Sequence, residues 1–143
     1  MIDAARFVVE ALPYYAHLGL RAEPDGRIVV PDAHPLTNHL GTQHGGALFS
    51  AGDAASWAAI LTEFADLVTD GAVPMVARGT IEYRGLARGT VWATAHVCAA
   101  STVREQFRTV GRAQCDVHVR LHDVENREIA IMTVTWRFAK IGD

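Results

Sequence analysis

One stretch decides the fold that the sequence predicts: Asn38-His39-Leu40-Gly41-Thr42-Gln43-His44-Gly45-Gly46-Ala47-Leu48-Phe49-Ser50-Ala51-Gly52-Asp53-Ala54-Ala55. A polar loop that ends in two glycines leads directly into an apolar, alanine-rich segment. One stripe of this segment holds Phe49, Asp53, Trp57, Ile60 or Leu61, and Phe64. The helical spacing predicts a helix from about Gly45 to Val68, packed closely on its neighbours.

The second half of the chain alternates apolar and polar residues with a period of two, which is typical of half-buried strands. The alternating segments are Val76 to Arg84, Val91 to Val97, Arg112 to His122 and Glu128 to Phe138. One buried and one wetter face per strand indicates an antiparallel sheet. Gly85 to Gly89 and Asp123 to Arg127 are the natural hairpin connections. The pattern predicts an α+β fold in which a curved antiparallel sheet wraps a long central helix.

The segments before the loop predict smaller elements. Asp3 to about Leu18 indicates a short amphipathic helix that breaks near Pro13. A first strand is expected over Leu20 to Val30, with Pro24-Asp25-Gly26 as an interruption or a tight turn. Pro31 to Gln43 is expected to form a loop.

Bulk properties indicate one domain over residues 1–143. The net charge of −3 gives no sign of a nucleic-acid or membrane partner. No apolar run approaches a membrane span of about 18 to 20 residues, and no signal peptide is recognised. Cys98 and Cys115 fit a reducing compartment, so we expect a cytoplasmic protein. We expect no cofactor and no metal, because His34, His39 and His44 do not share a helix face and no further ligand joins them.

The start of the predicted helix carries groups suited to hydrolysis. Its free N–H groups and partial positive charge suit a developing oxyanion. Asp53 lies among apolar residues, where a carboxylate needs a chemical role or a specific partner. Gly45 and Asp53 lie about 12 Å apart along a helix axis, whereas a donor and a base must both lie within ~3 Å of one reacting group. The spacing predicts that the two groups come from different subunits of a dimer.

The motif resembles that of hotdog-fold acyl-CoA thioesterases of the PaaI-like group. The likeness rests on Asn38, five intervening residues, His44-Gly45-Gly46, and then six residues to Asp53. It extends over residues 15–139, through the long helix and the strands after Pro74. The resemblance implies a hotdog fold that hydrolyses an acyl-CoA thioester. It also implies a homodimer, often paired into a tetramer, with its sites at the subunit interface and no metal.

The resemblance also implies residue roles. Asp53 would activate water or attack the thioester carbonyl, which the N–H of Gly45 would polarise. Asn38 would help to place the water or the substrate, His44 would order the loop, and Gly46 would lie in the substrate-binding part of the loop. The chain departs from the family's pattern at Ala77, where relatives often carry Thr or Ser, and at Gly85, where they often carry Pro. Ala77 removes a possible supporting hydroxyl, which bears on rate and substrate more than on fold. Residues 40–48 and 76–89 also resemble a related hotdog branch of largely unassigned function.

Each role has a structural alternative. Asp53 could pair with an arginine, His44 could simply cap the loop, and the two glycines could serve only close helix packing. Some arginines could bind the phosphates of coenzyme A or could be charges on a solvated sheet edge. These candidates are Arg84, Arg88, Arg108 and Arg112. The alternative function is a non-catalytic hotdog protein that binds an acyl ligand or a protein partner.

Overall fold

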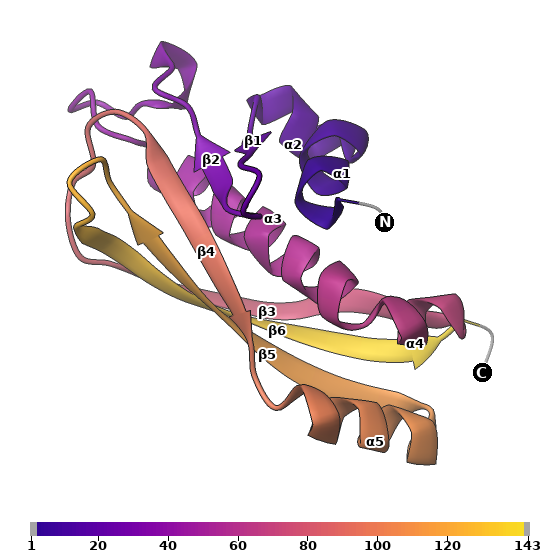
Figure 1. The fold of residues 1–143 in the computed structure, drawn as a ribbon. Coiled ribbons are helices and arrows are strands. Elements are labelled where there is room, and N and C mark those ends of the chain that lie inside the picture. The colour runs from indigo at the N-terminus through magenta and orange to yellow at the C-terminus, as the bar shows by residue number, and fades with distance from the viewer. Residues whose placement is uncertain (1–2, 142–143) are drawn as a thin grey trace.

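A curved six-stranded sheet wraps around one long helix in the computed structural model, which describes residues 3–141 (Figure 1). The helices are α1 (Ala4–Ala11), α2 (Pro13–Leu18), α3 (Gly45–Glu63), α4 (Ala65–Thr69) and α5 (Ala100–Val110), with a 3-10 turn at His34–Leu36. The strands are β1 (Arg21–Ala22), β2 (Ile28–Val30), β3 (Ala72–Tyr83), β4 (Val91–Val97), β5 (Arg112–His122) and β6 (Glu128–Lys140). Their order in the sheet is β1-β2-β4-β5-β6-β3, and every pair is antiparallel. The predicted α+β hotdog fold is confirmed.

The long helix α3 is defined by local sequence at both ends. His44 is its N-cap, and Phe64 ends it by leaving helical geometry before α4 begins. The predicted helix to Val68 is therefore two helices. Within α3, a Cβ atom at Gly52 would overlap the sulfur of Met132, so glycine lets the helix approach the sheet closely.

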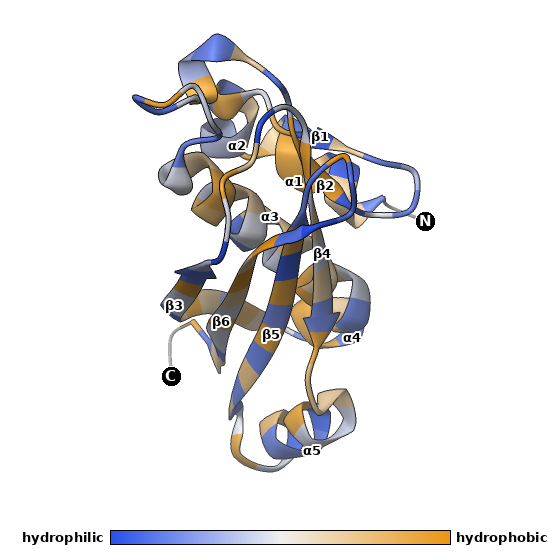
Figure 2. Cartoon of the chain, turned by 90° about the vertical axis from the view of Figure 1, so that its left-hand side faces the viewer, coloured by the Kyte–Doolittle hydropathy of each residue, from blue (hydrophilic) through white to orange (hydrophobic). Residues whose placement is uncertain are grey.

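The strand predictions hold for β4 and β5, whose bounds match the alternating segments. Figure 2 shows the alternation along β5 as bands of hydrophilic and hydrophobic residues. The hairpin over Asp123 to Arg127 is confirmed, because it joins the paired strands β5 and β6. The hairpin predicted over Gly85 to Gly89 is wrong: β3 pairs with β6, and this segment crosses from the sheet edge to β4 in its middle. Alternation fixes which face of a strand is buried, but not which strand lies beside it.

Two segments near the ends of the sheet differ from simple strands and loops. The single strand over Leu20 to Val30 is instead a hairpin of two short strands, and of the two readings of Pro24-Asp25-Gly26 the tight turn is confirmed, with Gly26 at φ of +89°. The connection from Ser101 to Gly111 is the helix α5, with Val103 and Phe107 buried one turn apart. The break near Pro13 is confirmed, since Pro13 begins α2 at a position where its missing N–H costs nothing.

Strand β3 forms an open edge of the sheet. It changes face at a bulge between Val76 and Arg78. Before the bulge Ala72 and Pro74 are buried, whereas beyond it Gly79 faces Phe49 of α3. Strand β3 is 12 residues long, and residues 75–80 in its middle are all exposed. An edge strand of this length presents a row of unpaired backbone groups that another chain could pair with.

The core lies between α3 and the concave face of the sheet. Phe64 packs edge-on against Phe138 at 5.1 Å between ring centroids, and Trp57 packs against Trp136 at 4.6 Å. Phe64, Trp136 and Phe138 are fully buried. No helix within residues 3–141 is long and apolar enough to cross a membrane.

We expect Ser56→Ala to destabilise the fold by about 1–3 kcal/mol, because it leaves a buried indole N–H without its acceptor. The Nε1–H of Trp136 donates to Ser56 Oγ at 3.1 Å, and neither residue has exposed surface. Thr62→Ala is the matched control, since its hydroxyl also bonds a helix carbonyl but lies at the surface. Denaturant unfolding measures both variants. Equal free-energy changes would contradict a special role for the buried pair.

Candidate functional site

Asp53 lies half-buried on α3 with one polar partner. The hydroxyl of Tyr15 donates a hydrogen bond to its Oδ2 atom. Burial raises the pKa of the Asp53 carboxyl, and the hydrogen bond from Tyr15 opposes that shift without cancelling it. No lysine or arginine within residues 3–141 forms an ion pair with Asp53, so the alternative of an arginine partner is wrong for the single chain. A carboxylate in this setting is suited to accept a proton.

The second candidate group, the N–H of Gly45, lies at the N-terminus of α3. Gly45 is the first residue of the helix, and its N–H makes no hydrogen bond within the part of the chain that the structure describes. Its carbonyl oxygen accepts a hydrogen bond from the Tyr83 hydroxyl at 2.8 Å. A Cβ atom at Gly45 would lie 3.0 Å from that hydroxyl and 3.1 Å from the adjacent ring carbon. The glycine therefore permits a close contact with the end of β3 and leaves one N–H donor free.

His44 and Asn38 hold the loop before the helix. The Nδ1 atom of His44 accepts a hydrogen bond from the N–H of Gly46 at 2.8 Å, so this nitrogen carries no proton and the side chain caps α3. The Oδ1 atom of Asn38 accepts from the N–H groups of Leu40 and Thr42 at 2.9 and 3.1 Å. The structure shows His44 as the N-cap of α3, and its role in a catalytic site stays a prediction. Contacts of Asn38 or Gly46 with water or substrate stay predictions.

Gln43 is a loop residue that the motif did not single out. Its side-chain nitrogen donates to the carbonyl oxygens of Pro31 and Gly89 at 3.1 and 2.8 Å, and its backbone N–H donates to that of Ala87 at 2.8 Å. The side chain is only 4% exposed, and its Oε1 atom has no partner within residues 3–141. Gln43 thus fastens the loop to the crossing segment after β3.

The chain places Gly45 and Asp53 apart, as their spacing predicts. Both lie on the single helix α3. A rise of about 1.5 Å per residue separates them by about 12 Å along its axis. A single chain therefore does not bring the free N–H and the carboxylate to the same reacting group.

The arginines proposed for coenzyme A lie at opposite ends of the chain's fold. Arg88 donates to the carbonyl oxygen of Leu40 at 3.3 Å, and Arg84, after the end of β3, pairs with Glu128 at 2.7 Å. Arg108 lies on α5 at the far end of the sheet, where it pairs with Asp66 at 3.1 Å (Figure 1). Of these arginines, the structure brings Arg88 to the loop and places Arg84 in an ion pair with Glu128, while Arg108 lies on α5 away from both. Arg112 is exposed at the start of β5.

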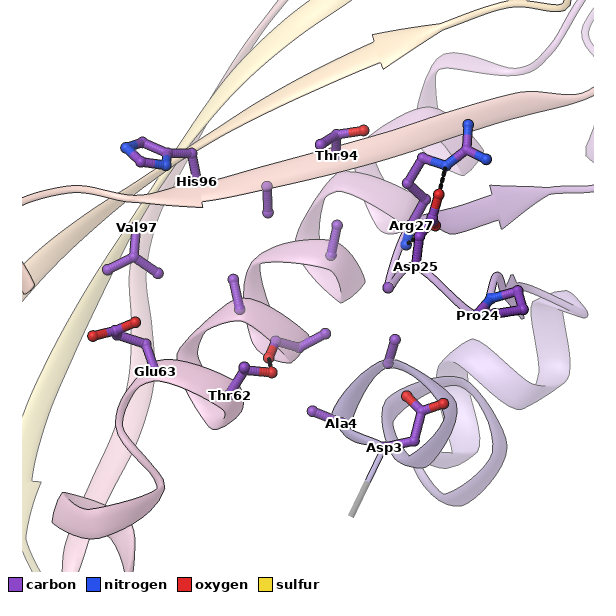
Figure 3. Close-up of a pocket in the computed structure, with 16 residues that line it drawn as sticks. Asp3, Ala4, Pro24, Asp25, Arg27, Thr62, Glu63, Thr94, His96 and Val97 are labelled. Carbon is purple, nitrogen blue, oxygen red and sulfur yellow. Dashed lines mark hydrogen bonds and ion pairs between the residues drawn. The ribbon is translucent and has the colours of Figure 1, made fainter. Parts of the chain in front are cut away.

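A cavity of about 510 Å³ opens on the other side of α3, between α1, β4 and the β1–β2 turn (Figure 3). Its floor is made of small residues of α3, Ala55, Ala58 and Ala59. Their positions on the helix are roughly opposite that of Asp53 at ~100° per residue. The ion pair of Asp25 and Arg27, 2.8 Å between Oδ2 and Nε, lies at its rim. This cavity therefore does not contain the candidate catalytic groups.

Cys115 offers no reactive thiol. Cys115 is buried, and burial raises the pKa of its thiol to about 11. A thiol in this state carries almost no thiolate at neutral pH, so it is a poor nucleophile.

Comparison with known proteins shows which solved structures share this fold. The solved structures that resemble the chain include a Pseudomonas aeruginosa protein of unknown function named as a probable thioesterase, with 24% identity, a TM-score of 0.83 and coverage of 95% of this chain and 93% of that one. A Chlorobaculum tepidum protein of unknown function has 19% identity, a TM-score of 0.80 and coverage of 96% and 92%. A Silicibacter pomeroyi thioesterase family protein has 21% identity, a TM-score of 0.72 and coverage of 96% and 97%. None of the curated proteins matches the sequence.

At these identities the likeness shows the fold alone, which is the hotdog fold of thioesterase superfamily proteins. The chain belongs to the family described as DUF4442, a domain of unknown function, whose model matches residues 5–138.

Proposed function

We propose that this protein hydrolyses an acyl-CoA or related thioester to the free acid and the thiol. The observation that carries the proposal is the half-buried carboxylate of Asp53, whose one polar partner in the described chain is a tyrosine hydroxyl. A carboxylate held in this way costs stability, and a role in catalysis explains why the protein keeps it. Asp53 acts as the general base for water or as the nucleophile. The names of the structural neighbours support thioester chemistry in general.

The oxyanion that forms in the reaction would be bound by the N–H of Gly45. This donor is free within residues 3–141 and lies at a helix N-terminus, where the helix dipole favours negative charge. Because Asp53 of the same helix is about 12 Å away, the active site needs Gly45 from one subunit and Asp53 from another. The active form is therefore a homodimer, and two such dimers would form the tetramer that the resemblance implies.

The open edge at β3 supports this dimer. Met75 and Val76 on this edge are 65% and 45% exposed. Along the adjoining side of α3, Phe49, Trp57 and Leu61 are only half-buried, in line with Asp53 at every fourth residue. A second copy that pairs along β3 would cover both surfaces and place its own loop against this stripe.

We expect the purified protein to release free thiol from at least one member of a panel of acyl-CoA esters that varies in chain length and aromatic content. A thiol-reactive dye measures the release, and heat-denatured protein is the control. Binding of these esters without hydrolysis would instead favour the non-catalytic acyl-binding protein. Ala77 stands where the resemblance implies a Thr or Ser hydroxyl, and this departure gives that alternative its physical basis.

A further inference from the structure

The helix α2 reaches the candidate site with two adjacent tyrosines, which the motif does not include. The hydroxyl of Tyr14 bonds Ser50 Oγ at 2.9 Å, and the hydroxyl of Tyr15 bonds Asp53 Oδ2. Ser50 in turn donates to the carbonyl oxygen of Gly46 at 2.8 Å. The two tyrosines thus contact successive turns of α3. They differ in setting, because Tyr15 is 5% exposed and Tyr14 is 58% exposed.

The two oxygens of Asp53 are not equivalent. Oδ2 accepts the Tyr15 hydrogen bond, whereas Oδ1 makes no hydrogen bond within residues 3–141. The ring of Tyr15 is held by burial, so it fixes the carboxylate in one orientation. A carboxylate that acts as a base or nucleophile needs one oxygen directed at the reacting atom, and a fixed partner on the other oxygen provides that direction.

We propose that Tyr15 is a positioning residue, whose hydroxyl holds Oδ2 of Asp53 so that Oδ1 is presented to the water or the thioester carbonyl. The inference rests on the proposed hydrolytic function. It assigns a role to an N-terminal helix, α2, that lies outside the loop and the central helix.

Tyr15 is the main polar influence on the Asp53 carboxyl, so its effect on the pKa of that carboxyl can be measured. Tyr15 of α2 is the titratable group that bonds to it, the Tyr14 hydroxyl bonds Ser50 instead, and no charged side chain of α1, α3 or the described strands bonds to it. Burial and the neighbouring carboxylate raise the pKa of Tyr15, so its hydroxyl keeps its proton and stays a donor. Its hydrogen bond favours the ionised carboxylate and lowers the pKa of Asp53, against the effect of burial. Loss of the hydroxyl therefore leaves a carboxyl that ionises at higher pH.

The test compares Tyr15→Phe with Tyr14→Phe, a matched control that removes the neighbouring hydroxyl from Ser50 instead. We expect Tyr15→Phe to move the acid limb of kcat/KM upward by about one pH unit, with about tenfold less activity below the limb and a smaller loss above it. Tyr14→Phe should leave the limb in place. A carbon-13 NMR titration of the aspartate carboxyls, assigned with Asp53→Asn, reads the same shift without substrate.

A Tyr15→Phe variant with unchanged limb and unchanged titration would overturn the proposal, as would an equal shift in Tyr14→Phe. In the Asp53→Asn background there is no carboxylate to position, so the effects of Tyr15→Phe on activity and on stability should both be smaller than in the wild-type background. Tyr15→Phe alone leaves the Asp53 carboxylate half-buried without its hydrogen-bond donor, whereas the double variant has no carboxylate there. The double variant therefore provides a folded reference if Tyr15→Phe alone unfolds. If the wild type hydrolyses no ester but the titration shifts, the hydrolytic function fails while the control of Asp53 by Tyr15 stands.

Discussion

Asp53→Asn is expected to reduce thioester hydrolysis by ~10²-fold or more without loss of the fold. The amide is nearly isosteric with the carboxylate and can still accept the Tyr15 hydrogen bond, but it can neither take a proton from water nor attack a carbonyl. Steady-state rates on the best ester of the panel measure the loss, and circular dichroism checks the fold. Equal rates in wild type and variant would exclude Asp53 as base or nucleophile.

The same substitution should stabilise the protein at neutral pH, by about 0.5–2 kcal/mol. The folded-state pKa of Asp53 is raised, so the folded protein binds a proton more tightly than the unfolded chain does. The stability from this carboxyl is fully present below its unfolded pKa and is lost as pH rises through its folded pKa. The gain from Asp53→Asn should therefore be largest above the folded pKa and should shrink toward acid pH. A variant that is less stable than wild type at neutral pH would show that the charge is structural.

The sequence predicts the parts of the fold that depend on local pattern. The alternation over Arg112 to His122 gives β5 with its bounds, and the spacing after His44 gives α3. The pairing of β3 with β6 lies beyond such patterns, because it depends on the neighbour that buries each strand. No sequence pattern predicts the bulge between Val76 and Arg78 either, although it reverses which residues of β3 face the helix.

The site shows the same division between local and distant contacts. The cap at His44 and the position of Gly45 at the start of α3 follow from neighbouring residues, so the motif predicts them. Tyr15 and Tyr83 each reach the site over 38 residues of chain, and Gln43 reaches Gly89 over 46. In the sequence Tyr15 is an ordinary aromatic residue of an amphipathic helix. A signal that could have found it is Asp53 itself, because a buried carboxylate requires a donor from somewhere.

A mixed dimer is expected to recover activity from two inactive parents, Asp53→Asn and Gly45→Pro. Proline removes the Gly45 N–H outright, and the first position of a helix tolerates it. His44, with φ of −65° and ψ of 135°, already has the extended conformation that a residue before proline requires. If each site takes Gly45 from one subunit and Asp53 from the other, a mixed dimer holds one intact site and one doubly altered site. Random exchange of equal amounts should then restore about a quarter of the wild-type rate per chain.

Gly45→Ala is the control for the proline variant, because it brings the same Cβ atom against Tyr83 but keeps the N–H. It should retain far more activity than Gly45→Pro, which separates the lost donor from the added bulk. Subunit exchange is checked by differently tagged chains recovered together. Exchange without recovery would show that Gly45 and Asp53 do not complete one another across the interface. Recovery fits only a site divided between two helices, since a single α3 keeps the donor and the carboxylate about 12 Å apart.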